Sequence, residues 1–289
     1  MSEPAVESQI EAHLNGVVAP GTALRRVSII LATLAIVGGA IEYPLALALK
    51  SLDRSELLRA LPFLAITLVL AALIPLALKL NAQLGLPGAP LIVAKCAGEK
   101  FHVSIRNLIK VSLGYALLAA IAGATVLGVV ILPLLLMKQG GMKLPNSPLL
   151  TVPPVRIAMI GALVAIAAAI SEEIQFRVVL YAIFGWVAAL ISRDSRGHPG
   201  RAALWIVTLL QGYAFGMVHL VPLAGALFHS TSRLMLAGLV MPQTWEGVVF
   251  GRLYLRRGVE ASIIAHASMD LALFVFAAIG VLQSHLGPK

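Results

Sequence analysis

The sequence predicts an all-α protein, a polytopic bundle of transmembrane helices, and three observations lead to this prediction. Hydrophobic residues make up 59% of the 289 residues. Charged residues make up 12%, about half of the ~25% that is usual in soluble domains. The charges are also unevenly placed and leave long stretches without Asp, Glu, Lys or Arg. Such stretches are long enough for helices that cross a bilayer.

The net charge of +9 does not indicate a nucleic-acid partner. A nucleic-acid-binding domain carries its basic residues on one face of a soluble fold. Here Lys and Arg mostly flank the apolar stretches, where they anchor helix ends at lipid headgroups. We therefore expect the lipid bilayer as a partner and no nucleic acid. The single cysteine, Cys96, excludes an internal disulfide and a metal site built from cysteines.

The N-terminal half is expected to begin with a polar tail at residues 1–26, which lacks the apolar core of a signal peptide. Transmembrane helices are expected within residues 27–137. Glu42 and Pro44 interrupt the first apolar stretch, and a purely structural role is preferred for this glutamate. Residues 138–154 then combine Gly, Pro and Asn, which end helices, and they divide the chain into two halves.

The C-terminal half, residues 155–283, is expected to hold a core of further transmembrane helices. One long helix or two short ones fit residues 157–192, and three more apolar stretches follow. The pattern predicts about seven spans in the whole chain, and six to eight are compatible with it.

Ionisable residues lie inside the predicted helices of the C-terminal half. Each of them costs at least ~2.5 to 3.5 kcal/mol within a bilayer. A chain retains such residues only where something offsets that cost, so they mark a candidate site. They fall in three short motifs: Glu172, Glu173 and Arg177 in SEEIQFR, His219 in FGMVHL, and His266 with Asp270 in HASMD.

Helical spacing assigns different roles to these residues, because side chains four apart share one face of a helix. Glu173 and Arg177 can form an ion pair, which favours a structural clamp. Glu172 is then an unpaired carboxyl, which suits a general base or a metal ligand, although a buried protonated core acid also fits. Phe215 lies one turn before His219 and can hold its ring.

The third motif has the same spacing. Asp270 lies one turn after His266, so it can orient the imidazole ring or reach into the same cavity. A hydrogen-bonded packing role for either membrane histidine is the alternative reading.

The depth of His266 constrains the segment before it. If residues 234–255 crossed the bilayer fully, His266 would lie about 20 Å too shallow to meet Glu172 and His219. We therefore expect the segment around 222–256 to be bent, re-entrant or unusually long, which is possible where backbone lines a water-filled cavity.

At these motifs the sequence resembles the CPBP family, the CAAX-processing and bacteriocin-processing intramembrane proteases that are also called Abi proteins. The family's signatures E-E-x-x-x-R, F-x-x-x-H and H-x-x-x-N or D are matched by Glu172, Glu173 and Arg177, by Phe215 and His219, and by His266 and Asp270. The stretch GVVFGRLYLRRGVEASIIAHASMD, residues 247–270, is also similar to the family's run before its last histidine. The resemblance covers about residues 155–282.

The resemblance implies an endopeptidase that hydrolyses a peptide bond of a membrane-associated protein or peptide. Glu172 would activate the attacking water together with His219, and His266 and the residue at 270 would support the developing oxyanion. Glu173, Arg177 and Phe215 would support the site. The expected location is a bacterial plasma membrane, in which the protein is a multi-pass integral protein.

Two points stay open within this resemblance. Position 270 is Asp, where the commoner Asn could donate a hydrogen bond to an oxyanion. An ionised Asp270 cannot donate, so it must be protonated, orient His266, or bind a metal. A divalent metal such as zinc is a possible cofactor, with Glu172, His219, His266 and Asp270 as the candidate ligands.

Two other functions compete with the endopeptidase. Buried Glu and His also serve as relay groups in proton-coupled membrane transporters, although the inverted repeats typical of many transporters are not visible. A catalytically silent protein of the same fold, which binds a peptide or confers immunity, is the second alternative. The sequence has no G-x-S-x-G and no H-E-x-x-H motif, and thus gives no support to a serine hydrolase or an ordinary zinc protease.

Overall fold

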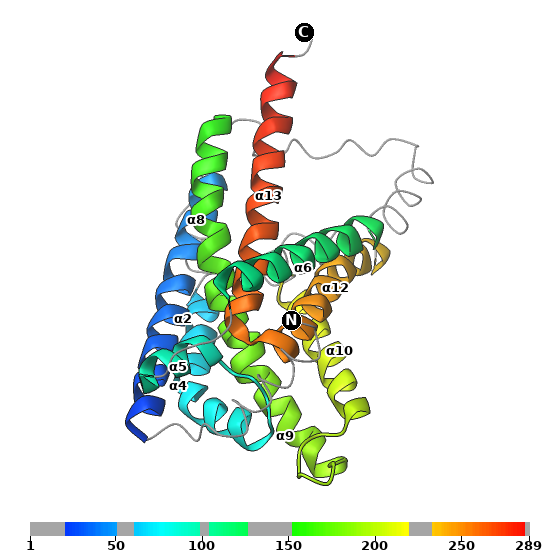
Figure 1. The fold of residues 1–289 in the computed structure, drawn as a ribbon. Coiled ribbons are helices and arrows are strands. Elements are labelled where there is room, and N and C mark those ends of the chain that lie inside the picture. The colour runs from blue at the N-terminus through cyan, green and yellow to red at the C-terminus, as the bar shows by residue number, and fades with distance from the viewer. Residues whose placement is uncertain (1–20, 51–60, 99–103, 127–151, 220–232, 287–289) are drawn as a thin grey trace.

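The computed structural model describes residues 21–50, 61–98, 104–126, 152–219 and 233–286. These residues form helices with connecting turns, and within them there is one isolated β-bridge and no strand. The helices are α2 (Gly21–Lys50), α4 (Leu61–Gln83), α5 (Pro90–Ala97), α6 (Ile105–Val126), α8 (Pro154–Glu173), η3 (Ile174–Leu180), α9 (Tyr181–Ile191), α10 (Arg201–Val218), α12 (Arg233–Arg257) and α13 (Val259–Leu286). The predicted all-α fold is confirmed (Figure 1).

Six helices in the described ranges are long and apolar enough to cross a membrane. They are Thr22–Glu42, Leu64–Gln83, Ile105–Val126, Pro154–Ile191, Arg201–Val218 and Val259–Gln283. Their surfaces carry large apolar side chains, such as Val69, Leu117 and Phe276, that are 62%, 63% and 70% exposed. Apolar surface of this extent suits hydrocarbon rather than water. The protein is therefore an integral, multi-pass membrane protein.

Two helices, α2 and α12, differ from the sequence expectations. α2 begins at Gly21, within the predicted tail, because Ala23 already packs into the core. α12 is a single helix and is not among the six candidate spans found in the described ranges. Its second half carries four charged residues, namely Glu246, Arg252, Arg256 and Arg257. The six spans found lie within the predicted range of six to eight. Residues 1–20 of the expected tail and residues 127–137 of the expected third span lie outside the described residues.

α8, η3 and α9 form one continuous helix over Pro154–Ile191, so the single long helix is the correct alternative for this stretch. At 1.5 Å per residue it is about 57 Å long, which exceeds one hydrocarbon thickness of ~30 Å. Its middle part, η3, is a π-helix that begins directly after Glu173. Such π-helical turns are rare and frequently occur at functional sites.

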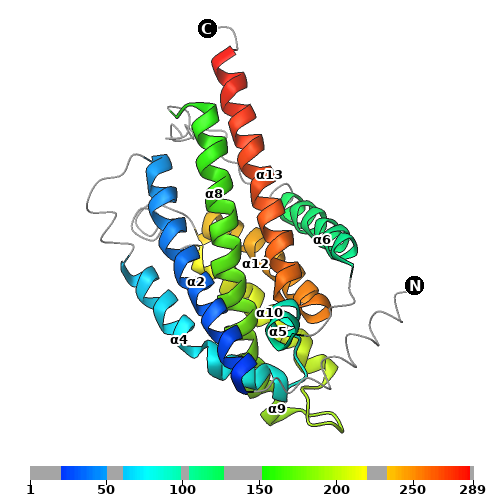
Figure 2. The ribbon, with the colours of Figure 1, turned by 60° about the vertical axis from the view of Figure 1, so that its left-hand side comes forward.

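The N-terminal half packs directly against this long helix. α2 runs antiparallel to α8 (Figure 2), and the contact is close at two glycines. A Cβ atom at Gly38 would lie 2.7 Å from the carbonyl oxygen of Ala167, and one at Gly39 would lie 3.2 Å from Oγ of Ser171. Only glycine allows this approach of the two helices.

A side chain of α4 also bonds to the π-helix. Asn81 donates from Nδ2 to the carbonyl oxygen of Val178 at 3.0 Å, and its Oδ1 accepts from the hydroxyl of Tyr254 at 3.2 Å. The main apolar core contains residues of both halves, such as Leu31, Ile74 and Ile174. The two halves of the chain therefore share one core.

α12 and α13 form a helical hairpin that turns at Gly258. This residue has a positive φ of 84°, which favours glycine. Oγ of Ser262 donates to the carbonyl oxygen of Phe250 at 3.1 Å and ties the two helices together. The hairpin sets the height of His266 next to Phe250.

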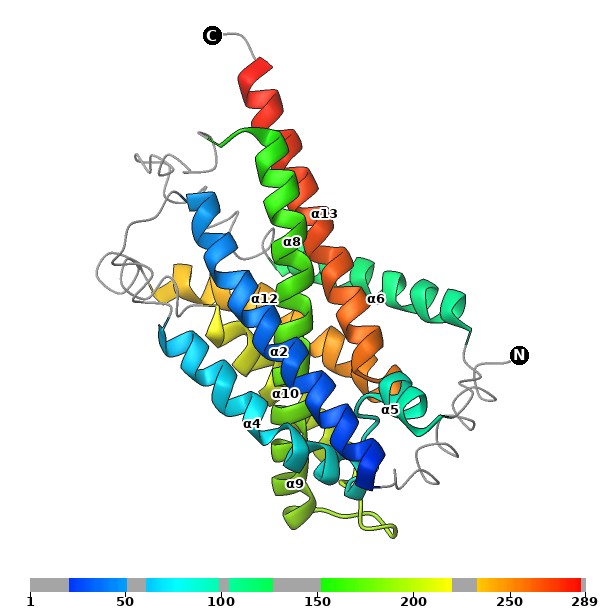
Figure 3. The same ribbon diagram turned by 90° about the vertical axis from the view of Figure 1, so that its left-hand side faces the viewer.

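The hairpin also explains how His266 reaches the same depth as Glu172 and His219. In Figures 1 and 3, α6 and α12 run obliquely across the long axes of α8 and α13. α12 thus does not travel the full height of α8 before the chain turns at Gly258, and His266 is not too shallow. The described part of the 222–256 segment is helical from Arg233 onwards, and residues 222–232 lie outside the described residues.

Close packing of α10 on α12 fixes this oblique path. Gly212 and Gly216 of α10 face Gly247 and the backbone of Thr244. A Cβ atom at Gly247 would lie 2.9 Å from Cα of Gly212. Small residues allow such close crossing of membrane helices.

Candidate functional site

The residues of the three sequence motifs lie together in the structure. Glu172 and Glu173 end α8, His219 follows the last residue of α10, and His266 and Asp270 lie in α13. Oε2 of Glu172 is 4.0 Å from Nε2 of His219 and 4.0 Å from Nε2 of His266. The continuous helix, α10 and α13 thus bring the three motifs of distant segments to one point.

Glu172 presents an oxygen with no protein partner. Its Oε2 is buried and accepts no hydrogen bond among the described residues. The separation of 4.0 Å from each histidine nitrogen is too long for a direct hydrogen bond. One water molecule with bonds of ~2.8 Å to each group can bridge a gap of this size.

The ring of His219 has a defined tautomer. Its Nδ1 lies 2.7 Å from the carbonyl oxygen of Phe215. Because a carbonyl oxygen only accepts, Nδ1 carries a proton and donates it, and Nε2 of the neutral ring is left with a lone pair facing Glu172. The side chain of His219 is 33% exposed, against 4% for His266. His219 therefore lies on the open side of the site.

His266 is held at both ring nitrogens. Nδ1 donates to Oε1 of Glu173 at 3.0 Å, and Nε2 lies 3.3 Å from Oδ2 of Asp270. The ring stacks on Phe250 with centroids 5.1 Å apart and meets Phe215 edge-on at 5.6 Å. Both carboxylates and both aromatic rings fix the orientation of this imidazole.

Glu173 and Arg177 form the ion pair that their spacing predicts. Nε and Nη2 of Arg177 donate to the two carboxylate oxygens of Glu173 at 2.8 and 3.1 Å, and both side chains are fully buried. The guanidinium also lies over the ring of Phe215, 5.2 Å from its centroid. The pair is more than a clamp within one helix, because Glu173 also holds His266.

Two acidic residues that the sequence did not single out as functional belong to the same region. Glu42 of α2 interacts electrostatically with Glu172, His219, His266 and Asp270. The structural role preferred for Glu42 from the sequence did not foresee this proximity. Glu246 of α12 interacts with Asp270, His266 and Glu172.

Counting outward from Gly258 would have placed Glu246 in the site. Phe250 and His266 are each eight residues from this turn, and Glu246 and Asp270 are each twelve residues from it. Equal distances from the turn place residues at equal height in an antiparallel hairpin. No comparable local pattern marks Glu42, which is close to the site only through the packing of α2 on α8.

The four candidate metal ligands are Glu172, His219, His266 and Asp270. Within the described residues, no group of three or more His, Cys, Asp and Glu side chains is arranged to hold a metal ion. Nδ1 of His219 and Nδ1 of His266 are bonded to Phe215 and Glu173, so each histidine has only Nε2 left as a possible ligand atom. The described residues thus do not form a metal site in this arrangement.

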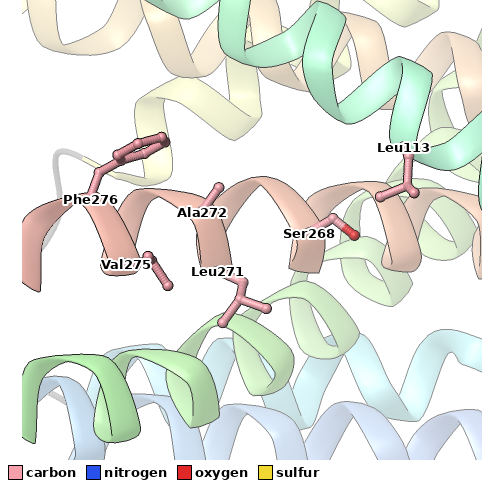
Figure 4. Close-up of a pocket in the computed structure, with 6 residues that line it drawn as sticks. All are labelled: Leu113, Ser268, Leu271, Ala272, Val275 and Phe276. Carbon is pink, nitrogen blue, oxygen red and sulfur yellow. The ribbon is translucent and has the colours of Figure 1, made fainter. Parts of the chain in front are cut away.

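An apolar hollow lies on the other side of α13. It has a volume of about 370 Å³ and is lined by Leu113 of α6 and by five residues of α13, namely Ser268, Leu271, Ala272, Val275 and Phe276 (Figure 4). Successive side chains of a helix are ~100° apart. Ser268 and Val275, which line the hollow, therefore point to the opposite face of α13 from His266 and Asp270. The hollow is separate from the candidate site.

Comparison with known proteins gives one match. The family model described as type II CAAX prenyl endopeptidase Rce1-like matches residues 154–272, a stretch that contains all three motifs. No curated protein and no solved structure matches the chain. The family match supports a membrane-embedded, CAAX-type endopeptidase in general. Residues 154–272 are thus similar to the Rce1-like type II CAAX prenyl endopeptidases, and the resemblance to the CPBP family is confirmed over these residues.

Proposed function

We propose that the protein hydrolyses a peptide bond of a membrane-associated protein or peptide, with Glu172 as the base that activates water. One observation carries this proposal. Oε2 of Glu172 is buried without a hydrogen bond from the described residues and lies 4.0 Å from Nε2 of both histidines. A carboxylate in this position can accept a proton from a water molecule that the histidines help to hold.

The first half of the reaction adds water to the scissile carbonyl. The water lies between Glu172 and His219, whose Nε2 lone pair accepts a hydrogen bond from it. Glu172 takes one proton as the water oxygen forms its bond to the carbonyl carbon, and the carbonyl electron pair moves to the oxygen. The product is a tetrahedral intermediate with one negative oxygen.

His266 is placed to stabilise that oxygen. When Glu173 and Asp270 are both ionised, a ring held between them carries a proton on each nitrogen. Its Nε2–H makes only a long contact of 3.3 Å with Asp270 and can be shared with the developing oxyanion. A positioned donor of this kind lowers the barrier by ~3 to 4 kcal/mol. In this account Asp270 orients His266 and does not itself donate to the oxyanion.

The second half of the reaction breaks the carbon–nitrogen bond. The negative oxygen re-forms the carbonyl group, and the bonding electron pair leaves with the nitrogen. Glu172 returns its proton to this nitrogen, so the amine leaves neutral and the carboxyl group is ionised again. Water is thereby divided between the two peptide products, and the site is restored.

A membrane-anchored peptide in a bacterial plasma membrane is the substrate setting that we propose. The active residues lie on helices whose outer surfaces are apolar, so substrates that are themselves held at a membrane reach them most readily. The family match, which names prenyl endopeptidases, supports the same class of substrate.

The test is cleavage by the full chain in liposomes. Membrane-anchored peptides are incubated with the wild type, with His266→Ala, and with His198→Ala, which removes a histidine outside the site. Mass spectrometry should find internal cleavage by the wild type and by His198→Ala, and a loss of about 10²-fold or more in His266→Ala. Cleavage that persists in His266→Ala contradicts the proposal. Proton flux without cleavage by the wild type favours a transporter.

A chelator forms the second arm of this experiment. The rate of the wild type should be unchanged by a zinc chelator, since the described donor atoms do not fit a metal. Loss of cleavage with the chelator and recovery with added zinc would show that cleavage depends on the metal, and would favour Asp270 and the histidines as its ligands.

A further inference from the structure

Three turns of the chain meet at one end of the helix bundle. Gly85, in the turn between α4 and α5, lies so close to His198 that a Cβ atom would be only 2.7 Å from Cε1 of its ring. His198 belongs to the turn between α9 and α10. The carbonyl oxygen of Gly88 accepts a hydrogen bond from the backbone N–H of Val259 at 3.0 Å, at the turn between α12 and α13. Three helix connections thus share this end.

α2 begins at the same end of the bundle. α5 packs against α2 (Figure 3). Leu24, in the first turns of α2, packs against the main apolar core, which also contains Leu86 and Ala89 of the α4–α5 turn. The start of α2 therefore lies with the three turns. We call residues 21–28, 79–98, 192–201 and 252–260 together the basic end, for the charges described next.

The exposed charges of the basic end are almost all positive. Eight Lys and Arg side chains are exposed there, among them Arg26, Lys79, Lys95, Arg193, Arg201 and Arg256. The basic end contains two acidic residues, and both are engaged within the fold. Asp194 pairs with Arg196 at 3.5 Å and accepts hydrogen bonds from backbone N–H groups of its own turn. Glu260 accepts a hydrogen bond from the backbone N–H of Ile92 at 3.0 Å.

Aromatic side chains hold two of the arginines that the α12–α13 hairpin brings to this end. The guanidinium of Arg252 lies over the ring of Trp205, 5.0 Å from its centroid. Nη1 of Arg256 donates to the hydroxyl group of Tyr115 at 3.0 Å. Trp and Tyr are enriched where a membrane protein passes from hydrocarbon to water, at the level of the lipid headgroups. These pairs therefore suit a surface at headgroup level.

The opposite ends of the same helices carry far fewer basic residues. The basic end holds ten Lys and Arg residues in all. The seven outermost residues at the other ends of α2, α4, α8, α10, α12 and α13 include only three, namely Lys50, Arg156 and Arg233. The turn at Gly258 produces much of this difference, because it places Arg252, Arg256 and Arg257 with the basic residues of the other turns.

We propose that the basic end lies at the cytoplasmic face of the membrane, where its lysines and arginines bind the anionic headgroups of phospholipids. Basic side chains form charge-assisted hydrogen bonds to phosphate oxygens, and the negative potential of the cytoplasmic leaflet attracts them. An excess of Lys and Arg in short connections between spans also keeps these connections in the cytoplasm. The inference gives the protein an orientation and a lipid partner, and it does not depend on the proposed function.

The orientation is tested by labelling single cysteines of the full chain in a bacterial plasma membrane with a membrane-impermeant maleimide. Ser195→Cys places the thiol in the exposed turn between α9 and α10, and Gln283→Cys places it on an exposed position at the other end of α13. Both variants also carry Cys96→Ala, which removes the native thiol. Ser195→Cys should be labelled in inverted vesicles and protected in spheroplasts, and Gln283→Cys should show the reverse.

The lipid partner is tested by native mass spectrometry of the purified full chain with added phosphatidylglycerol or phosphatidylcholine. We expect tighter binding of the anionic lipid by about tenfold or more, since several basic residues act together. The double variant Lys95→Gln/Arg201→Gln should lose about fivefold or more of this preference. Arg156→Gln, at the opposite end of the long helix, is the control and should keep it. Thermal unfolding shows whether each variant is folded.

Two results would overturn the inference. Labelling of Ser195→Cys in spheroplasts, with Gln283→Cys protected there, would place the basic end outside the cytoplasm. Equal binding of the two lipids by the wild type, or an unchanged preference in the folded double variant, would contradict the lipid partner. Neither measurement uses cleavage, so each result leaves the proposed function unaffected.

Discussion

Glu173 accepts a hydrogen bond from Nδ1 of His266 at 3.0 Å, although the two residues lie 93 positions apart in the chain. The same carboxylate pairs with Arg177 through both of its oxygens. A continuous chain of contacts therefore runs from Arg177 through Glu173 and His266 to Asp270. This chain connects the long helix to α13 and sets the position of the imidazole beside Glu172.

Removal of Arg177 should destabilise the protein strongly. Arg177→Ala leaves the fully buried Glu173 without its guanidinium, and an uncompensated buried charge costs about 3 to 5 kcal/mol of unfolding free energy. The measurement is denaturant or thermal unfolding in detergent. Arg201→Ala, which removes an exposed arginine at the start of α10, is the control and should change stability by less than about 0.5 kcal/mol. Equal effects of the two substitutions would contradict the structural role of Arg177.

Asn81 should control the geometry of the site from the N-terminal half. Its Nδ2 donates to the carbonyl oxygen of Val178 in the π-helix, and Asn81→Asp removes this donor while it keeps the acceptor for Tyr254. An unsatisfied buried carbonyl costs about 1 to 3 kcal/mol. Lower stability and a lower kcat, with little change in KM, are the expected results. A variant that matches the wild type in both properties would show that the bond is not required.

Two substitutions distinguish an orienting contact of Asp270 from a requirement for its negative charge. Asp270→Asn places an amide 3.3 Å from Nε2 of His266. Because this amide can itself donate a hydrogen bond to the oxyanion, the variant should retain activity within about tenfold of the wild type. Asp270→Leu removes this partner, and a loss of about 10²-fold in kcat is expected because His266 is then poorly oriented. Comparable loss in both variants would mean that the negative charge of Asp270, and not its orienting contact, is required.

Local features of the site could be predicted from the sequence because helix geometry fixes them. The spacing of four residues places Glu173 beside Arg177, and it places Phe215 beneath His219 with ring centroids 4.8 Å apart. Neighbouring residues on a helix diverge by about 100°, which separates Glu172 from the ion pair. These relations need no knowledge of how the helices pack.

Contacts between helices could not be predicted in the same way. The bond from His266 to Glu173 depends on the oblique path of α12. That path depends on the close contact of Gly212 with Gly247, which no spacing in the sequence predicts. The estimate that His266 would be too shallow assumed an upright crossing. The π-helix was also not predicted, since its seven residues, Ile174–Leu180, carry no signal that distinguishes them from an α-helix.

Glu42 shows the same limit in the N-terminal half. A glutamate beside a proline in an apolar stretch has no local feature that relates it to residues more than a hundred positions away. Its proximity to Glu172 follows from the glycine contact between α2 and α8. Sequence motifs thus mark the C-terminal part of the site, whereas packing determines what the N-terminal half adds to it.

The most direct test of the account is the rate of peptide cleavage by Glu172→Gln in liposomes. This substitution preserves the size of the side chain and removes the carboxylate that we propose as the acceptor of the proton from water. The account predicts a kcat lower by about 10² to 10⁴-fold, with KM and the unfolding temperature close to those of the wild type. Cleavage within about threefold of the wild type by the folded variant would contradict the assignment of Glu172 as the base.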